Sequence, residues 1–301
     1  MNKEEIENFV KFFQKHYSDD LLENRRGLIE VMKIVSDLSD SLGDVKLNLP
    51  SWKYYSNSLI HKLIFTSNSI IKLSEGFEMI SYDKLHRIYI IDFSSMYILT
   101  RVIIENFLTL DYIFINKLPD EQKFFRFKVW EMAGLMTRQN FSSEDSDFLE
   151  MKKKEKAVID EIYNQIKQMP DFKNLNSKQL NSLNKFGLPR INSWHQLINE
   201  SGLNKSVFST TYSLFSNYAH SEYLSILQIQ QSSMASDDIE NLNRIKQCFA
   251  VVRIINSLVI KWILSEFPTS GIVYEKFSKE IKMVLEVWAQ IGKSDFEVNN
   301  S

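Results

Sequence analysis

The chain has 301 residues and a formal net charge of −2, with 44% hydrophobic and 25% charged residues. This balance is typical of a soluble globular protein and gives no global electrostatic argument for binding nucleic acid or an anionic membrane. The single cysteine, Cys248, excludes an intramolecular disulfide and a multi-cysteine zinc site, while only 8 glycines and 5 prolines favour long helices over a turn-rich β fold.

Two amphipathic patterns open the chain and predict helices over residues 3–17 and from about 19 to 42. Ser18 or Asp19 should cap the second helix, and Gly43 should stop it. A two-helix hairpin cannot bury both apolar stripes on its own. We therefore expect residues 1–42 to form an arm that packs on the rest of the chain or forms a homodimer contact.

The next three helices are predicted between residues 50 and 140. The first should begin at Pro50–Ser51 and end at Gly76, and the third should follow Pro119. Between them, an apolar pattern runs from about 83 to 118. Its start, HRIYIIDF, is rich in β-branched residues and would also suit a strand. Because the apolar run continues far past ordinary strand length, we favour a helix.

Composition changes at residue 141, where an apolar pattern gives way to a polar one. Ser142–Asp145 should cap an exposed helix that ends at Pro170, and an Asn-, Lys- and Ser-rich stretch follows. We expect residues 141–192 to project from the core. Further helices are predicted over 194–200, 205–218, 236–267 and 271–292, with a loose tail after them.

These patterns together predict an all-α fold. The whole chain, residues 1–301, should form a single domain of long antiparallel helices packed around the central helix at about 83–118. Residues 43–140 and 193–292 should supply its core.

The central stretch, Asp92–Asn116, is apolar nearly all round, which places a helix in the middle of a core. Ser94, Arg101, Glu105 and Thr109 are spaced by seven, four and four residues, so they align along one stripe. An ion pair in that position needs local compensation, because losing one partner of a buried pair costs roughly 3–5 kcal/mol.

A second polar stripe is the candidate partner for the first. Tyr212, Ser216 and His220 are spaced by four residues and would share one face of a helix. A phenol, a hydroxyl and an imidazole could together satisfy Arg101 and Glu105. The combined group suggests a site with catalytic candidates Arg101, Glu105 and His220 and binding candidates Tyr212, Ser216 and Thr109. The alternative is a structural ion pair that fixes helix register.

The two motifs, Leu99-Thr100-Arg101-x3-Glu105 and Tyr212-x3-Ser216-x3-His220, resemble those of the family called domain of unknown function 5677. The resemblance covers roughly residues 50–265. It implies an all-helical prokaryotic domain with these polar residues gathered at one site, and it brings no established activity. By analogy with the family, the biological context would be stress or phage defence.

A separate pattern, Arg190-x4-His195, is similar to the ribonuclease motif of helical HEPN domains. In those domains arginine stabilises phosphate charge and histidine works as an acid or base. The chain departs from the family pattern at two points. Pro189 and a cap at Ser193 would place Arg190 in a loop, and Ile191 stands where the family favours a polar residue.

Metal and nucleotide motifs fail on inspection, so we expect no metal and no cofactor. Three functions remain. The leading one is a cytoplasmic protein whose Arg101/Glu105/His220 cluster binds a ligand or protein partner. The second is a metal-independent, HEPN-type ribonuclease acting on RNA through Arg190/His195 or Arg101/His220. The third is a structural interaction module. No membrane partner is expected, because charged residues interrupt both of the most apolar runs and the first residues do not resemble a signal peptide.

Overall fold

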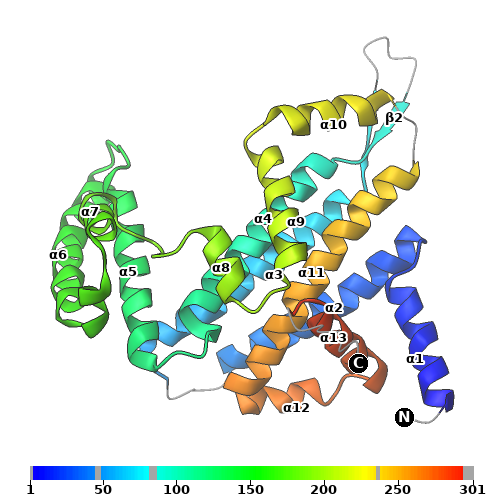
Figure 1. Ribbon diagram of the computed structural model, residues 1–301, viewed down its shortest axis with the longest axis horizontal. Coiled ribbons are helices and arrows are strands. Elements are labelled where there is room, and N and C mark those ends of the chain that lie inside the picture. The colour runs from blue at the N-terminus through cyan, green and yellow to red at the C-terminus, as the bar shows by residue number, and fades with distance from the viewer. Residues whose placement is uncertain (1–2, 45–48, 81–86, 235–237, 294–301) are drawn as a thin grey trace, which may run out of the picture. The chain divides into compact units, whose positions relative to one another are not determined.

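The structure is a computed structural model that describes residues 3–44, 49–80, 87–234 and 238–293. It confirms the all-α fold, with one short β-hairpin as the exception among the described residues. The chain forms two compact units (Figure 1). The first unit comprises residues 1–50, 54–108 and 198–301, and the second comprises 51–53 and 109–197. The single-domain organisation stays a prediction.

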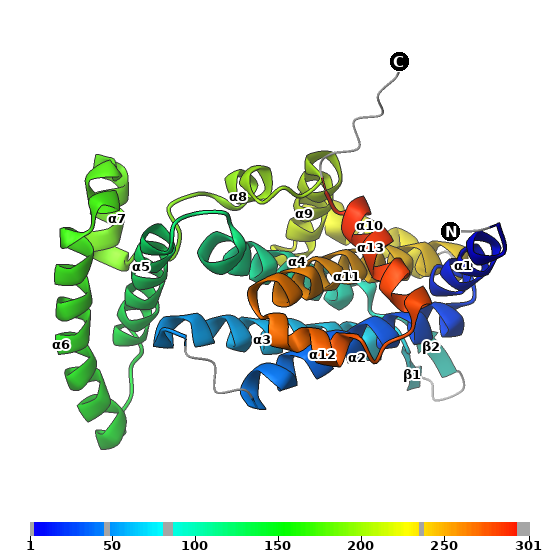
Figure 2. The same cartoon turned by 90° about the horizontal axis from the view of Figure 1, so that it is seen from below.

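Helix α2 (Leu21–Asp44) is part of the core of the first unit. It lies beside α11 (Asp238–Glu266) in Figures 1 and 2 and also packs on α3 (Tyr55–Leu73). Its inward side chains are at most 1% exposed: Leu28, Val31, Ile34, Val35 and Leu38. The expected cap at Ser18 or Asp19 is wrong, because Asp20 Oδ1 accepts the Leu22 N–H at 2.8 Å. The helix also continues one residue past Gly43.

Helix α1 (Lys3–His16) packs on α2 and on α13 (Lys279–Ile291), where the Phe13 ring lies 5.8 Å from that of Trp288. Residues 3–42 therefore pack on the rest of their own unit. The homodimer contact through this segment stays a prediction.

The middle of helix α11 lies in the core of the first unit, with Phe249, Val252, Ile255 and Ile263 all fully buried. Among the described residues, only its segment Ile239–Glu266 is long and apolar enough to cross a membrane, and 72% of its most apolar window is buried in the protein. That burial is the pattern of a core helix.

One charged side chain lies inside this core. Arg253 on α11 is 0% exposed, and its Nη2 donates to both the backbone oxygen and Oδ1 of Asn24 on α2. Its guanidinium lies 5.6 Å from the Trp288 ring. Burial lowers the pKa of Arg253 to about 9. The side chain thus ties the beginning of α2 to the middle of α11.

The expected helix at 83–118 begins later than predicted. A β-hairpin pairs β1 (Phe77–Ile80) with β2 (Arg87–Ile90), and α4 starts only at Phe93 and ends at Leu110. Residues 87–91 are rich in β-branched side chains, which favour a strand, and here this preference outweighs the helix that the longer apolar run predicted. Gly76 lies between α3 and β1 and has a φ of +66°, a backbone conformation that residues other than glycine rarely adopt. A π-helical turn, Asp111–Ile115, follows α4.

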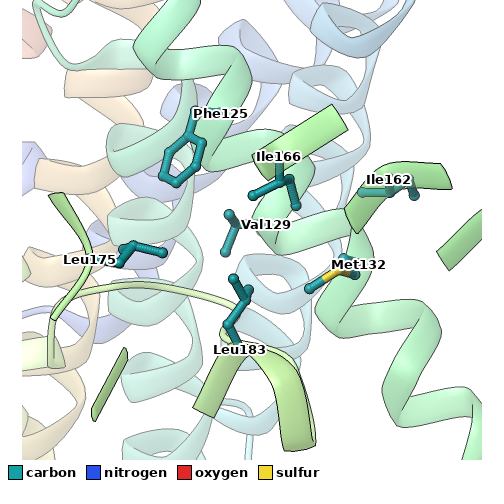
Figure 3. Packing of buried hydrophobic residues seen from close by; sticks show 7 residues of the cluster. All are labelled: Phe125, Val129, Met132, Ile162, Ile166, Leu175 and Leu183. Carbon is teal, nitrogen blue, oxygen red and sulfur yellow. The ribbon is translucent and has the colours of Figure 1, made fainter. Parts of the chain in front are cut away.

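The second unit is built on α5 (Asp120–Gln139), α6 (Ser146–Gln168) and α7 (Ser177–Phe186). Figure 3 shows the side chains that converge between them: Phe125, Val129, Met132, Ile162, Ile166, Leu175 and Leu183. Asp145 caps α6 as predicted, by accepting the Asp147 N–H at 2.8 Å. Four members of the cluster come from the segment 141–192, so this segment shares a core with α5, and α6 is not exposed on all sides.

The remaining helices follow the predicted order with two differences. Helices α8 (Trp194–Glu200) and α9 (Lys205–Ala219) lie where expected, whereas α10 (Tyr223–Met234) was not predicted. The segment expected as one helix over 271–292 forms two, α12 (Gly271–Tyr274) and α13. The expected loose tail at 294–301 lies outside the described residues, as do Ser236 and Asp237 of the expected cap.

Candidate functional site

The two polar stripes meet within the first unit, where α4 faces α9. Helix α9 begins at a cap in which Asn204 Oδ1 accepts the Val207 N–H, and it ends at His220. Glu105 on α4 is the centre of the cluster. Its Oε1 accepts the Arg101 Nε–H at 3.0 Å and the Tyr212 hydroxyl at 2.9 Å. Glu105 therefore lies within hydrogen-bond reach of Arg101 and also of Tyr212, which belongs to the second stripe.

Arg101 also contacts His220. The Arg101 Nη1 lies 3.3 Å from His220 Nε2, at the end of α9 where the imidazole is exposed. Because a guanidinium nitrogen only donates, Nε2 is the acceptor in this contact, and a neutral His220 ring carries its proton on Nδ1. The guanidinium carbon also lies 5.4 Å from the Tyr212 ring centroid. Arg101 is therefore held from several directions.

The ion pair is less buried than the sequence suggested. The side chains of Arg101 and Glu105 are 17% and 23% exposed, so water reaches the pair. The cost of roughly 3–5 kcal/mol for losing one partner of a fully buried pair therefore does not apply here. Partial solvation brings the contribution of the pair down from the fully buried range towards about 1 kcal/mol.

Tyr212 is the most buried member of the cluster, at 5% exposed. Burial and, after it, the hydrogen bond to the Glu105 carboxylate raise the pKa of this phenol. The hydroxyl therefore keeps its proton at neutral pH and remains a donor. The Tyr212 hydroxyl holds the Glu105 carboxylate in place, and the carboxylate in turn holds the Arg101 guanidinium.

Two further members, Ser216 and Thr109, were predicted for the site. The Ser216 hydroxyl donates to the backbone oxygen of Tyr212 at 2.7 Å, within its own helix. Thr109 follows Glu105 by one helical turn and falls in the second unit, and its place in the site stays a prediction. We call Arg101, Glu105, Tyr212 and His220 the cluster.

The residues of the R-x4-H pattern lie in the second unit. Arg190 is in a loop, as expected, and its guanidinium carbon lies 3.8 Å from the Trp194 ring centroid. His195 is exposed in the first turn of α8. The ribonuclease role of this pair stays a prediction.

A group of aromatic rings, for which the sequence predicted no role in the site, joins α4 to α9. The Tyr97 ring centroid lies 4.5 Å from that of Phe215 and 4.9 Å from that of Tyr218. Tyr97 precedes Arg101 by four residues. The spacing that aligns Arg101 with Glu105 therefore also places the Tyr97 ring on the same stripe of α4. The aromatic contacts hold the two helices at the separation that the polar cluster requires.

In the described ranges, no three His, Cys, Asp or Glu side chains are grouped so that they could hold a metal ion.

Comparison with known proteins gives a family and nothing more specific. No curated protein and no solved structure matches the chain. The model of a family of unknown function, DUF5677, matches residues 53–238. This range contains α4, α9 and all four residues of the cluster, and it covers more than half of the sequence. The chain therefore belongs to the DUF5677 family of unknown function.

Proposed function

We propose that the cluster binds the anionic group of a ligand, with Arg101 and His220 as the contacting residues. One observation carries the proposal. Glu105 holds the Nε side of the guanidinium, while Nη1 lies beside the exposed His220 imidazole. An arginine oriented in this way presents its remaining donors without further loss of side-chain freedom. A phosphate or carboxylate at that edge would receive hydrogen bonds from both residues.

Inorganic phosphate is the simplest probe of this site. In the wild-type protein it should raise the melting temperature in a saturable manner and shift the His220 imidazole resonances, because ligand bound to the folded state stabilises it by mass action. Arg101→Met should abolish both effects. Glu105→Gln should weaken binding by about tenfold, the loss expected when a charge-assisted hydrogen bond is removed from a partly exposed site.

The matched control is Arg26→Met, which removes an exposed arginine from α2 in the same unit. Its phosphate response should equal that of the wild type. If Arg101→Met and Arg26→Met respond alike, the cluster is a structural link between α4 and α9 and the proposal is wrong. Circular dichroism on each variant separates lost binding from lost fold.

The contact between an arginine and a histidine favours a second candidate, a metal-independent ribonuclease. In that reading Arg101 stabilises charge on a phosphodiester, and His220 transfers a proton. A general acid or base contributes about 10²–10⁴-fold in rate, so His220→Asn should remove nearly all turnover while the fold persists.

The ribonuclease test uses a pool of structured and single-stranded RNAs in the presence of EDTA. Cleavage that is lost in His220→Asn but kept in His195→Asn would assign the chemistry to the cluster. The reverse pattern would assign it to Arg190 and His195. Absence of cleavage by the wild type would rule out the ribonuclease and leave the ligand-binding proposal.

The biological setting is proposed from the family resemblance alone. We propose a cytoplasmic prokaryotic protein that acts in stress or phage defence, with a homodimer formed through residues 1–42. Expression in a phage-sensitive bacterium should lower plaque counts, and Arg101→Met should restore them. Equal plaque counts with and without the protein would argue against a defence role.

A further inference from the structure

The second unit contains a pocket that is separate from the Arg101 cluster. It has a volume of about 140 Å³ and lies between the beginning of α5, the short helix η3 (Pro170–Asn174), the beginning of α7 and Ile191. Phe125 and Leu175, which belong to the buried cluster of Figure 3, line its apolar side. Its volume is below the roughly 300–1,000 Å³ of pockets that hold drug-sized ligands. The pocket therefore suits a molecule smaller than a nucleotide.

Two opposite charges line this pocket. Arg126 comes from α5 and Asp171 from η3, and both are half-buried. Across the part of the chain that the structure describes, neither side chain forms an ion pair, with the other or with any further residue. A pocket that holds one cation and one anion that do not neutralise each other is complementary to a ligand that also carries both charges.

Arg126 is held in place before any ligand arrives. Its Nη1 donates to the Tyr112 backbone oxygen at 2.8 Å, and its guanidinium carbon lies 4.2 Å from the Tyr112 ring centroid. The Tyr112 hydroxyl accepts the Ile191 N–H at 3.3 Å, which fixes the loop that closes one side of the pocket. The guanidinium retains donors beyond the one used on Tyr112. Its position is thus set by the fold.

Carboxamides supply the remaining polar surface. Gln122 and Asn174 line the pocket, and within the described ranges neither side chain is hydrogen-bonded to the protein. Gln179 also lines it, but its Oε1 accepts the Asn176 N–H at 2.9 Å in the cap of α7. Carboxamides both donate and accept, so Gln122 and Asn174 can complete the hydrogen bonds of either charged group of a ligand.

We propose that this pocket binds a small zwitterion, specifically a free α-amino acid. The ligand ammonium pairs with Asp171 and the Asn174 oxygen, and the ligand carboxylate pairs with Arg126 and the Gln122 amide. The ligand side chain lies toward Phe125 and Leu175. A molecule of about ten heavy atoms in such a site should bind with a Kd on the order of 0.1–1 mM.

The test begins with the twenty common L-amino acids, each at 10 mM, using ligand-observed NMR on the full chain. The amino acid that responds is then compared with its α-amide, which lacks the carboxylate, and with its N-acetyl derivative, which lacks the ammonium. Each derivative should bind about tenfold more weakly than the free amino acid, since each loses one charge-assisted contact. This pattern distinguishes a zwitterion site from a general apolar pocket.

Asp171→Asn is the decisive variant, because it removes the negative charge while keeping the size of the side chain. It should weaken binding of the free amino acid by about tenfold and abolish the preference over the N-acetyl derivative. The matched control is Asp160→Asn, an exposed position on α6 of the same unit, which should bind like the wild type. Arg101→Met should also leave binding unchanged, so this result is independent of the phosphate experiment.

Three outcomes would overturn the proposal. The first is that no amino acid binds at 10 mM. The second is equal binding of the free amino acid and both derivatives. The third is an Asp171→Asn variant that binds like Asp160→Asn while circular dichroism shows an intact fold.

Discussion

A chain that begins at residue 43 should fail to fold its first unit. It lacks α2, whose five innermost side chains are at most 1% exposed. Each such side chain contributes about 1.5–3 kcal/mol when buried, so their loss amounts to on the order of 10 kcal/mol, comparable with the total stability of a domain. Circular dichroism should show reduced helix content, and size-exclusion chromatography should show aggregation.

The matched control is a chain that begins at residue 18 and lacks only α1. Because α1 contributes the outer layer against α2 and α13, this chain should remain folded with a lower melting temperature. The expectation fails if the chain beginning at residue 43 is monomeric and melts cooperatively with the full enthalpy of the intact protein.

Acid should destabilise the protein through His16, a side chain that is 3% exposed. Burial, and next the charge of Arg253, lower the pKa of His16 to about 4, against an ordinary value of 6.5. The unfolded chain therefore takes up this proton first as the pH falls. The contribution of neutral His16 is complete above pH 6.5 and is lost progressively towards pH 4, a change of about 3 kcal/mol in the free energy of unfolding.

Urea denaturation at several pH values between 7 and 4 measures this effect. His16→Asn should flatten the decline relative to the wild type, and His195→Asn, at an exposed position, should not. Glu30 lies 3.2 Å from His16 Nε2 and burial raises its pKa, so His16→Asn reports on this coupled pair as a unit. Parallel curves for the wild type and His16→Asn would show that another group governs the acid response.

Most residues of the candidate site could be predicted, because helical spacing alone aligns them along one face of each helix. An interval of four residues placed Arg101 with Glu105, and two such intervals placed Tyr212 and His220 on one helix face. The structure brings the two stripes together through Glu105 with Tyr212 and Arg101 with His220. Spacing does not report which direction a hydroxyl takes, so Ser216 was assigned to the cluster although it bonds within its own helix. Spacing also does not report how exposed a stripe is, so the partial exposure of Arg101 and Glu105 could not be predicted from the sequence.

The fold was predictable as a class and in most of its helices, but two features depended on tertiary packing. Strand β2 lies at the start of the apolar run whose continuation as α4 made a single long helix the simpler prediction. The boundary between the units falls after Leu108, inside α4, where composition does not change. The change of composition at residue 141 lies just before α6 and does not coincide with a boundary between the units.

The discontinuous make-up of the first unit has a consequence for synthesis on the ribosome. Helix α2 ends at Asp44, and α11, on which it packs, begins only at Asp238. At roughly 5–20 residues per second, about 10–40 s pass between the emergence of the two helices. The second unit, nearly contiguous at 109–197, is complete within that interval. The nascent chain should thus carry a finished second unit while the apolar face of α2 still lacks its partner, and it is during this interval that a holding chaperone would recognise it.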